Sequence, residues 1–381
     1  MDIEEYIESS DYLKRFFKFE EIYIKDLTNG INEVFLLENK KKDIQIILKR
    51  ALPYFKQYGP KHPLNVNRIL YEAKALKFFK SCNQNFVPNL YFFDEKENLI
   101  VIEYIKNKIS LNQFLQRGII NKNFSEQISD FLSANFLKTS TFGTNAEERE
   151  KLLNTFQANK HMEDLSVQFI FTDLIDRYTK LTNSNKKTNA LFLDLDSQNS
   201  LLFKNIEGLK NKFISQNDCL LHGDLKGASI LLNEDDISII DYEFSNFGPI
   251  SYDLSSIIYV FVALTINYDL ARCDKEYISW LLFVIEDIWY KFKEKISLNK
   301  KIDTKYYDML LKDMIGFMGV QMLSMMIPHV VPFNSNNIKK ENEDIYYTKM
   351  GLIAKTFVNN HKSFNSIEQA VKVLKTHLQY Y

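Results

Sequence analysis

The chain has 381 residues, 45% of them apolar and 25% charged, which is typical of a globular protein with enough length for two lobes or domains. Its 48 Lys and Arg nearly balance its 49 Asp and Glu, so no overall charge draws it to nucleic acid or to an anionic membrane surface. The 11 Gly and 7 Pro are few beside 30 Phe and 21 Tyr, which favours a well-packed, helix-rich body.

The first hundred residues predict a small sheet with one helix. Four short segments are β-branched or alternating and are separated by polar turns, as in antiparallel strands. They are Ile22–Lys25, Glu33–Leu37, Ile44–Leu48 and Leu99–Glu103. Before the last of them, Asn67–Phe79 has apolar residues at helical spacing and predicts one amphipathic helix.

From about Ser110 onward the apolar spacing is almost entirely helical. Helices are predicted over Leu111–Leu115, Ser125–Thr139 and Asn145–Thr155. The exception is Cys219–Asp241, where two brief apolar runs flank the acidic turn Asn233–Asp236 and predict a hairpin. The order of elements predicts an α+β fold with two lobes: a sheet lobe over residues 1–105 and a mainly helical lobe over residues 106–381.

Acidic side chains gather at the ends of the predicted hairpin. Asp224 precedes its first strand, with Ser229 five residues later, while Asp241 and Glu243 directly follow its second strand. Because the start of one hairpin strand meets the end of its partner, we expect these four side chains to converge. Phosphoryl transfer needs a carboxylate that orients or deprotonates the acceptor hydroxyl, and oxygen ligands for Mg²⁺. With the Asp224–Asp241 spacing of a kinase catalytic loop and its metal-binding Asp, the set indicates a kinase.

The sheet lobe supplies a cation for the nucleotide. Lys49 follows the strand Ile44–Leu48, and Glu72 lies on the next helix, where kinases have a phosphate-binding lysine and its ion-pair partner. The predicted nucleotide loop is 26–32, with Asn29 and Gly30 as its turn. The loop contains one glycine, so this assignment depends on its position and not on a glycine-rich motif.

Several blocks of the sequence occur in the order and spacing found in the methylthioribose kinases of bacteria and plants. These blocks are Leu48–Tyr54, Pro63-Leu64, Glu72-Ala73, Phe171–Asp173, Leu221–Leu225, Ser229-Ile230, Ile240–Phe244, Phe247–Ile250, Asp253 and Gly316–Gly319. The chain resembles that family over most of its length. The family belongs to the aminoglycoside phosphotransferase and choline kinase group, which has a protein-kinase-like fold. It phosphorylates the anomeric hydroxyl of 5-methylthioribose with MgATP in methionine salvage, commonly as a homodimer.

The resemblance implies roles in nucleotide binding. It implies ATP and Mg²⁺ as cofactors and a small-molecule acceptor, with a sugar expected. Lys49 would contact the ATP phosphates. Glu103, Tyr104 and Ile105 would form the hinge that binds the adenine.

The resemblance also implies roles in catalysis and metal binding. Asp224 would act as the catalytic base or hydroxyl-orienting group. Asp241 and Glu243 would be metal ligands, together with Ser229, which stands where protein kinases have Asn. Asp253 is expected to brace the catalytic loop through backbone hydrogen bonds.

The sequence departs from the family pattern at three places. The family has proline between its two metal-binding acids, where this chain has Tyr242. Lys226 follows the catalytic aspartate closely, where the family has histidine, and would alter the charge near the acceptor or the γ-phosphate. Two adjacent arginines that help the family hold its substrate are replaced by Ser324 and Met325, which predicts a remodelled acceptor pocket because two cations are lost.

Two alternatives to a methylthioribose-type kinase stay open. One is a kinase of the same fold with another acceptor, such as a different sugar, an aminoglycoside, an amino alcohol or a protein. The other is a non-catalytic nucleotide-binding module. The presence of Lys49, Asp224, Asp241 and Glu243 argues against that module.

The cysteines and the N-terminal segment bear on the cellular setting. Cys82, Cys219 and Cys273 are an odd number without CxxC spacing, so neither a disulfide framework nor a zinc site is expected. The acidic start lacks the basic-then-apolar order of a signal peptide. The longest apolar run, Ile257–Ile266, is shorter than the about 20 residues of a membrane helix. We therefore expect a cytoplasmic protein that does not act at a membrane.

Overall fold

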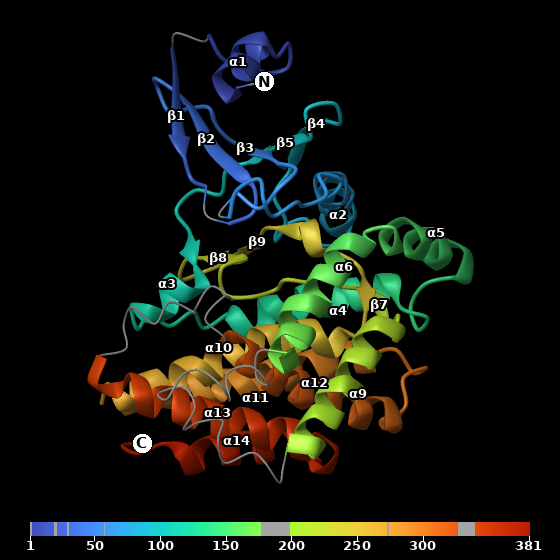
Figure 1. Cartoon of the computed structure of the whole chain (residues 1–381), viewed down its shortest axis with the longest axis vertical. Helices are drawn as coiled ribbons and strands as arrows, with labels where there is room; N and C mark the ends of the chain where they lie inside the picture. Colours follow the sequence, from blue (N-terminus) through green and yellow to red (C-terminus); the bar gives the residue numbers. More distant parts are fainter. Residues whose placement is uncertain are drawn as a thin grey trace. The chain divides into compact units, whose positions relative to one another are not determined.

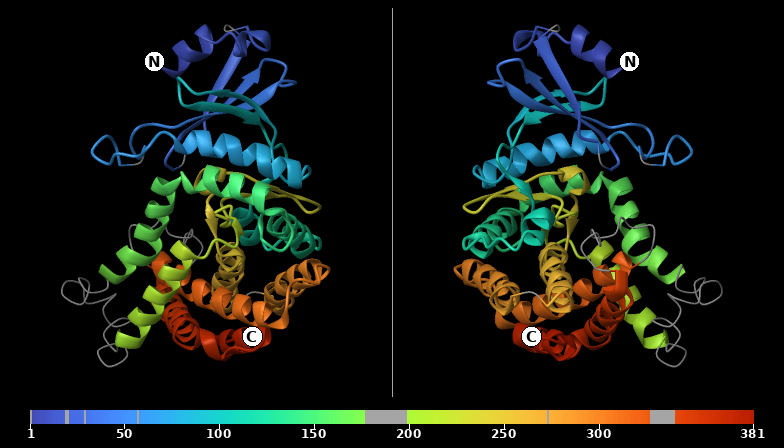
Figure 2. Two further views of the ribbon diagram at one scale, coloured as in Figure 1. Left: turned by 90° about the vertical axis from the view of Figure 1, so that its right-hand side faces the viewer. Right: turned by 90° about the vertical axis from the view of Figure 1, so that its left-hand side faces the viewer.

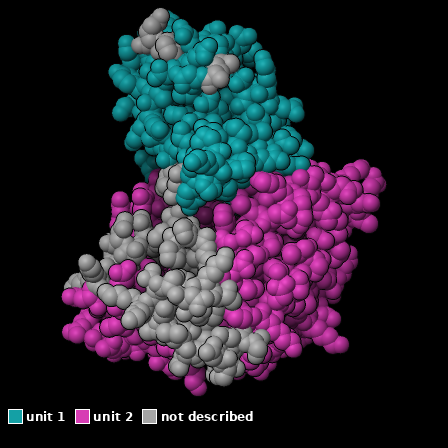
Figure 3. Space-filling view, viewed as in Figure 1, with its two compact units in different colours: residues 1–107, 238–244 teal, residues 108–237, 245–381 magenta. Residues whose placement is uncertain are grey.

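A computed structural model describes residues 2–18, 21–28, 30–56, 58–176, 199–272, 274–326 and 340–381. Asn29 and Cys273 lie outside the described residues. The chain divides into two compact units, drawn in teal and magenta in Figure 3. Unit 1 comprises Met1–Asn107 and Ser238–Phe244, and unit 2 comprises Lys108–Ile237 and Ser245–Tyr381. The predicted boundary after residue 105 falls close to the division after Asn107, but the second segment of unit 1 was not predicted.

Unit 1 is built on a five-stranded antiparallel sheet of order β1-β2-β3-β5-β4. The strands are β1 (Ile22–Asp26), β2 (Glu33–Asn39), β3 (Gln45–Arg50), β4 (Leu90–Asp94) and β5 (Leu99–Glu103). All four predicted strands are confirmed, and β4 is an additional one. Figure 1 shows this sheet with the labels used here.

Two helices cover the sheet of unit 1 on opposite faces (Figure 2). α1 (Ile3–Ser9) packs Ile3, Tyr6 and Ile7 into a core with Leu37 and Leu48. α2 (Arg68–Cys82), which confirms the predicted helix, contacts β4 and β5. Because side chains alternate along a strand, Leu48 faces α1 and its neighbour Lys49 faces α2.

Unit 2 is mainly helical, and its three predicted helices are confirmed as α3 (Leu111–Gln116), α4 (Phe124–Thr139) and α5 (Ala146–Gln157). The following described helices are α6 (Lys160–Val167), a π-helical stretch (Gln168–Thr172), α9 (Asn199–Ser215), α10 (Ile250–Leu270), α11 (Lys275–Ser297), α12 (Thr304–Met325), α13 (Glu343–Asn360) and α14 (Ile367–His377). α10 packs against α11, α12 and α13 and forms the centre of this core. By length and hydropathy α10 could cross a membrane, but 94% of its apolar window is buried in the fold, as in a core helix.

Short strands flank the loop 221–229 of unit 2. β7 (Cys219–Leu220) pairs with β10 (Phe247–Gly248), and β6 (Ile109–Ser110) pairs with β8 (Ile230–Leu232). The turn between β8 and β9 (Ile237–Ile239) is closed by the Asn233 N–H, which donates to the Asp236 carbonyl at 3.2 Å. The predicted hairpin is therefore present, and the loop that carries Asp224 lies between β7 and β8.

A buried carboxylate holds the C-terminal residues onto unit 2. Asp269, near the end of α10, is fully buried and accepts the backbone N–H groups of Gln379, Tyr380 and Tyr381 at 2.7–2.9 Å. Asp269→Asn keeps the shape but turns one acceptor oxygen into an NH₂ group. Since hydrogen bonds to charged groups contribute about 1.5–3 kcal/mol each, we expect a loss of ~2–4 kcal/mol in urea denaturation. The exposed Asp308→Asn is the control, and equal stabilities of the two variants would contradict the prediction.

Candidate active site

Lys49 is the centre of a buried charge cluster in unit 1. Its Nζ lies 2.9 Å from Glu72 Oε1, 3.0 Å from Asp241 Oδ1 and 3.7 Å from Glu243 Oε1. The side chains of Lys49 and Glu72 are only 4% and 1% exposed, whereas that of Asp241 is 42% exposed. Burial by itself lowers the pKa of Lys49, but the three carboxylates outweigh it and raise the pKa well above its ordinary value. Lys49 is therefore a permanent cation at neutral pH.

Glu72 is the most deeply buried carboxyl group of this cluster. Burial raises the pKa of Glu72 to about 7, against the attraction of Lys49. Its Oε2 atom is buried without a hydrogen-bond partner, so a proton there is less costly than a full negative charge. The predicted pairing of Lys49 with Glu72 is present.

The segment 238–244 carries Asp241 and Glu243 into unit 1. The Ile239 N–H donates to the Phe86 carbonyl at 2.7 Å. The Tyr242 ring packs on Phe79 of α2 with ring centroids 4.9 Å apart, and Tyr242 is fully buried in the core of unit 1. Asp241 has a φ of 67°, a left-handed conformation that Asp tolerates better than most residues and that often marks functional sites.

Two polar residues that the sequence analysis did not single out hold Glu243. Asn32 Nδ2 donates to Glu243 Oε2 at 2.8 Å, and Arg68 Nε lies 3.4 Å from the same oxygen. A usable signal was present, because Arg68 stands four residues before Glu72 and therefore lies on the same face of α2. A charged pair on the buried face of a helix predicts a polar cluster there.

The predicted nucleotide loop is partly described. Gly30 has a φ of 139° and nothing within 4 Å of an added Cβ, so its conformation and not its surroundings favours glycine. Thr28 ties the loop to β2, because its Oγ1 accepts the Val34 N–H at 3.1 Å. Asn29, the other residue of the predicted turn, lies outside the described residues.

The predicted hinge follows β5 in unit 1. The Glu103 side chain is bound by Asn89, whose backbone N–H and Nδ2 both donate to Oε2, at 3.0 and 2.7 Å. Tyr104 and Ile105 lie just beyond the strand and are half-buried. Their role in adenine binding stays a prediction.

In unit 2, Asp253 fixes the backbone of the loop that carries Asp224. Its carboxylate accepts the N–H of His222 at 2.7 Å and that of Gly223 at 3.1 Å. Gly223 has a φ of 84°, a left-handed conformation that favours glycine at this sharp bend. The Asp224 N–H donates to His222 Nδ1 at 3.3 Å. These contacts agree with the predicted bracing role of Asp253.

The Asp224 carboxylate has a cationic neighbour. Lys226 Nζ lies 2.9 Å from Asp224 Oδ2, and the two side chains are 47% and 27% exposed. Ser229 is buried, and its N–H donates to the Lys226 carbonyl at 2.9 Å. Asp224 and Ser229 thus belong to unit 2, whereas Asp241 and Glu243 belong to unit 1, so the predicted meeting of all four stays a prediction.

The carboxylates of unit 1 fit the needs of a Mg²⁺ ion bound with a nucleotide. Such an ion uses one or two protein carboxylates and completes its octahedron with phosphate oxygens and water. Asp241 and Glu243 offer two carboxylates on one short segment, both close to Lys49. Within the described ranges, no group of three or more His, Cys, Asp or Glu is arranged to hold a metal. The ion would therefore depend on the nucleotide for its other ligands.

Ser324 and Met325, which were expected to replace two arginines of the family, lie at the end of α12 in unit 2. Ser324 is fully buried, and its hydroxyl donates to the Gln321 carbonyl at 2.8 Å. Met325, next to it, is half-buried at the end of α12. Neither residue supplies a charge, and the remodelled acceptor pocket stays a prediction.

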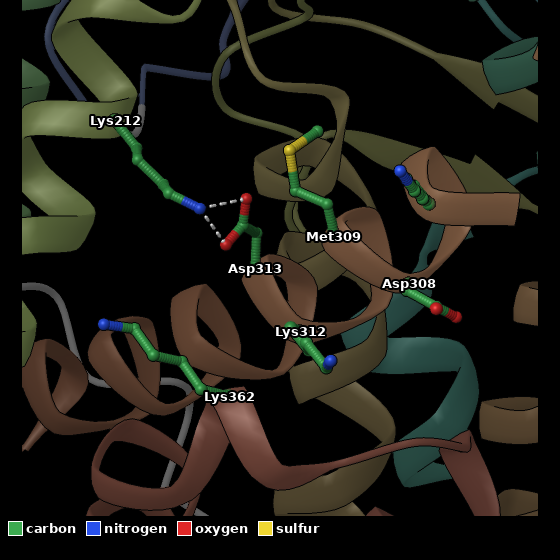
Figure 4. Close-up of a pocket in the computed structure, with 7 residues that line it drawn as sticks. Lys212, Asp308, Met309, Lys312, Asp313 and Lys362 are labelled. Atoms are coloured by element: carbon green, nitrogen blue, oxygen red, sulfur yellow. Dashed lines mark hydrogen bonds and ion pairs between the residues drawn. The ribbon is translucent and has the colours of Figure 1, made fainter. Parts of the chain in front are cut away.

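One pocket formed by the described residues lies in unit 2. It has a volume of about 330 Å³ and is lined by residues of α9, α12 and the 361–363 turn (Figure 4). Lys212 and the buried Asp313 form an ion pair in its wall, with Lys212 Nζ 2.7 Å from Asp313 Oδ2. Lys312 and Lys362 point away from each other (Figure 4), and no predicted site residue lines it. We assign it no part in the chemistry.

The buried Asp253 makes stability depend on pH. Burial raises the pKa of Asp253 to about 7, although the N–H groups of His222 and Gly223 oppose the shift. An unfolded Asp has a pKa of about 3.9, so between about pH 4 and 7 the native state keeps a proton that the unfolded state releases. The contribution of Asp253 to the free energy of unfolding therefore falls as the pH rises through this window and is level above it.

The measurement compares wild type with Asp253→Asn, which lacks this titration. The difference between their free energies of unfolding, from urea denaturation at pH 4.5 and pH 7.5, is expected to shift against the wild type at the higher pH. At about 1.4 kcal/mol per pKa unit, the shift is at most ~4 kcal/mol. Parallel pH profiles of the two proteins would contradict it.

Comparisons with known proteins indicate the family of the chain. The sequence model of the phosphotransferase enzyme family matches residues 167–280. A methylthioribose kinase of Bacillus cereus is 30% identical, with 83% of this chain and 82% of the relative covered. Methylthioribose kinase 2 of Oryza sativa subsp. japonica is 26% identical, with 93% and 89% covered.

The fold has solved counterparts as well. The crystal structure of choline kinase from Cryptosporidium parvum Iowa II matches with a TM-score of 0.51 at 12% identity, covering 98% of each chain, and confirms the protein-kinase-like fold. The identity and coverage shared with the bacterial relative show the family. The chain belongs to the methylthioribose kinase family and is an ATP-using phosphotransferase that acts on a hydroxyl group of a small molecule.

Proposed function

We propose that the protein transfers the γ-phosphoryl group of ATP, in the presence of Mg²⁺, to the anomeric hydroxyl of 5-methylthioribose or a related ribose analogue. The observation that carries the proposal is Asp224, a carboxylate on a loop whose backbone is held by Asp253. The names of the relatives support the sugar.

In the proposed reaction the acceptor oxygen bonds to the γ-phosphorus, the bond to the β–γ bridging oxygen breaks, and ADP leaves. Asp224 orients the acceptor hydroxyl and accepts its proton. Lys49 offsets the charge of the phosphates, while Glu72 holds the Lys49 ammonium. Asp241 and Glu243 would hold Mg²⁺, which would neutralise charge on the phosphate oxygens.

A second candidate is a kinase of the same fold with a different acceptor. Ser324 and Met325 favour it, because the cations that help the family hold its substrate are absent at these positions. The sugar pocket of this chain then differs from that of its relatives.

We also propose that the protein forms a homodimer and is located in the cytoplasm.

The test is an ATP-consumption screen with 5-methylthioribose, ribose analogues, other sugars, aminoglycosides and choline-like alcohols. We expect the highest kcat/KM for 5-methylthioribose or a close ribose analogue, and a ³¹P NMR signal of an anomeric phosphate. A clear preference for an aminoglycoside or an amino alcohol would overturn the proposed identity of the acceptor. Binding of MgATP in a thermal-shift series without turnover of any acceptor would favour the non-catalytic module.

A further inference from the structure

Arg68 is a fully buried cation at the start of α2. Its side chain is 0% exposed, and an uncompensated charge in such a place is strongly unfavourable. Nη1 donates to the Asn65 carbonyl at 2.8 Å, and Nη2 donates to the Ile31 carbonyl at 3.4 Å. Nε donates to Asn32 Oδ1 at 2.9 Å and lies 3.4 Å from Glu243 Oε2. Arg68 therefore links the Ile31 carbonyl, the Asn32 side chain and the Glu243 carboxylate.

Asn32 bridges the guanidinium and the carboxylate. Its Oδ1 accepts from Arg68 while its Nδ2 donates to Glu243 Oε2 at 2.8 Å. The two contacts require one amide orientation, with the oxygen toward Arg68 and the nitrogen toward Glu243. Asn32 is 3% exposed, so water cannot readily replace either bond. An isosteric aspartate could accept from Arg68 but could not donate to Glu243.

The two oxygens of Glu243 have different neighbours. Oε2 is held by Asn32 and Arg68, and Oε1 lies 3.7 Å from Lys49 Nζ. Lys49 is closer to Glu72 and Asp241, at 2.9 and 3.0 Å. The orientation of Glu243 is thus set by Asn32 and Arg68 more than by Lys49.

We propose that Asn32 and Arg68 are positioning residues that orient the Glu243 carboxylate toward Mg²⁺ bound with ATP. This inference rests on the proposed function, in which Glu243 helps to hold that ion. Partners that orient a metal-binding carboxylate typically change metal affinity by about 10–100-fold when they are removed. The same residues hold the backbone of the predicted nucleotide loop, so the loop and the carboxylate are fixed by one set of bonds.

The experiment measures binding by calorimetry, without any acceptor. The probe is the non-hydrolysable ATP analogue AMP-PNP, with Mg²⁺ or with EDTA, and the readout is the ratio of the two Kd values. We expect Asn32→Asp to raise the Kd with Mg²⁺ by about 10–100-fold and to change the Kd with EDTA much less. Asn39→Asp is the matched control, because Asn39 also donates to a carboxylate, that of Asp43, but at an exposed site in the same unit.

The double variant Asn32→Asp/Glu243→Gln separates positioning from stability. A glutamine amide can donate to the new carboxylate, so we expect the thermal stability to recover while the Mg²⁺-dependent affinity stays low. The inference would be overturned if Asn32→Asp kept the wild-type ratio of the Kd values with Mg²⁺ and with EDTA. It would also be overturned if the double variant fully recovered that ratio. An absence of Mg²⁺-dependent binding in the wild type would overturn it as well. A wild type that binds Mg²⁺·AMP-PNP normally but phosphorylates no sugar overturns the proposed acceptor alone.

Discussion

Asp224→Asn is expected to lower kcat by about 10²–10⁴-fold and to leave the Kd for ATP nearly unchanged. Asparagine has the shape of aspartate but cannot accept the proton of the acceptor hydroxyl. The loop should keep its conformation, because Asp253 holds it through the N–H groups of His222 and Gly223. The measurement is steady-state turnover with the best acceptor from the screen, with circular dichroism to verify the fold.

Two further variants test whether the loss of kcat is caused by the loss of the Asp224 carboxylate. Asp236→Asn is the matched control, because Asp236 is also an acid of unit 2 that pairs with a lysine, Lys108, at 3.1 Å. We expect it to keep nearly full activity. Lys226→Met removes the cation from Asp224 but keeps the carboxylate, so its activity should lie between those of Asp224→Asn and the wild type. Full phosphotransfer by Asp224→Asn would refute the catalytic assignment.

Lys49→Met is expected to lower the free energy of unfolding by about 3–5 kcal/mol, the usual cost of removing one partner from a buried ion pair. The variant leaves Glu72, Asp241 and Glu243 near one another without the ammonium that they surround. The unfavourable energy of the unpaired charge would be largest at Glu72, because its side chain is only 1% exposed. Urea denaturation measures the loss, and calorimetry with ATP measures the accompanying loss of nucleotide affinity.

The controls for Lys49 use the same substitution and the same unit. Lys56→Met removes a lysine that pairs with Glu33 at 2.7 Å but is 39% exposed, so we expect a change below about 1 kcal/mol. The double variant Lys49→Met/Glu72→Gln should regain part of the stability, because the deepest carboxylate is then neutral, but not the nucleotide affinity. Wild-type stability in Lys49→Met would show that the cluster is not held by this charge.

Local patterns made much of the fold predictable. The strands around Lys49 are short, mostly apolar segments between polar turns, and the helix that carries Glu72 has apolar residues at helical spacing, so each was visible in a short window of sequence. β4 was missed although its residues Leu90–Phe93 are apolar or aromatic; it is an edge strand of the sheet, and its residues are mostly half-buried. The pairing of Lys49 with Glu72 followed from the order strand, lysine, helix, glutamate.

Contacts between distant parts of the chain were harder to predict. Asp241 and Glu243 follow a strand in a region otherwise assigned to the helical lobe, yet the segment 238–244 belongs to unit 1. Asn32 and Arg68 bind Glu243 from more than a hundred residues away in the sequence. Local periodicity does not predict such a contact, because the contact depends on which buried faces meet after the chain has folded.

The sequence by itself determined the α+β class, the acidic hairpin and the pairing of Lys49 with Glu72, because these depend on short-range spacing. Only the tertiary structure decided that Asp241 and Glu243 belong to unit 1, that Asn32 and Arg68 hold Glu243, and that Ser324 is a core residue. The physical reason is burial. A buried charge or amide needs specific partners, and those partners come from wherever the fold brings a complementary group.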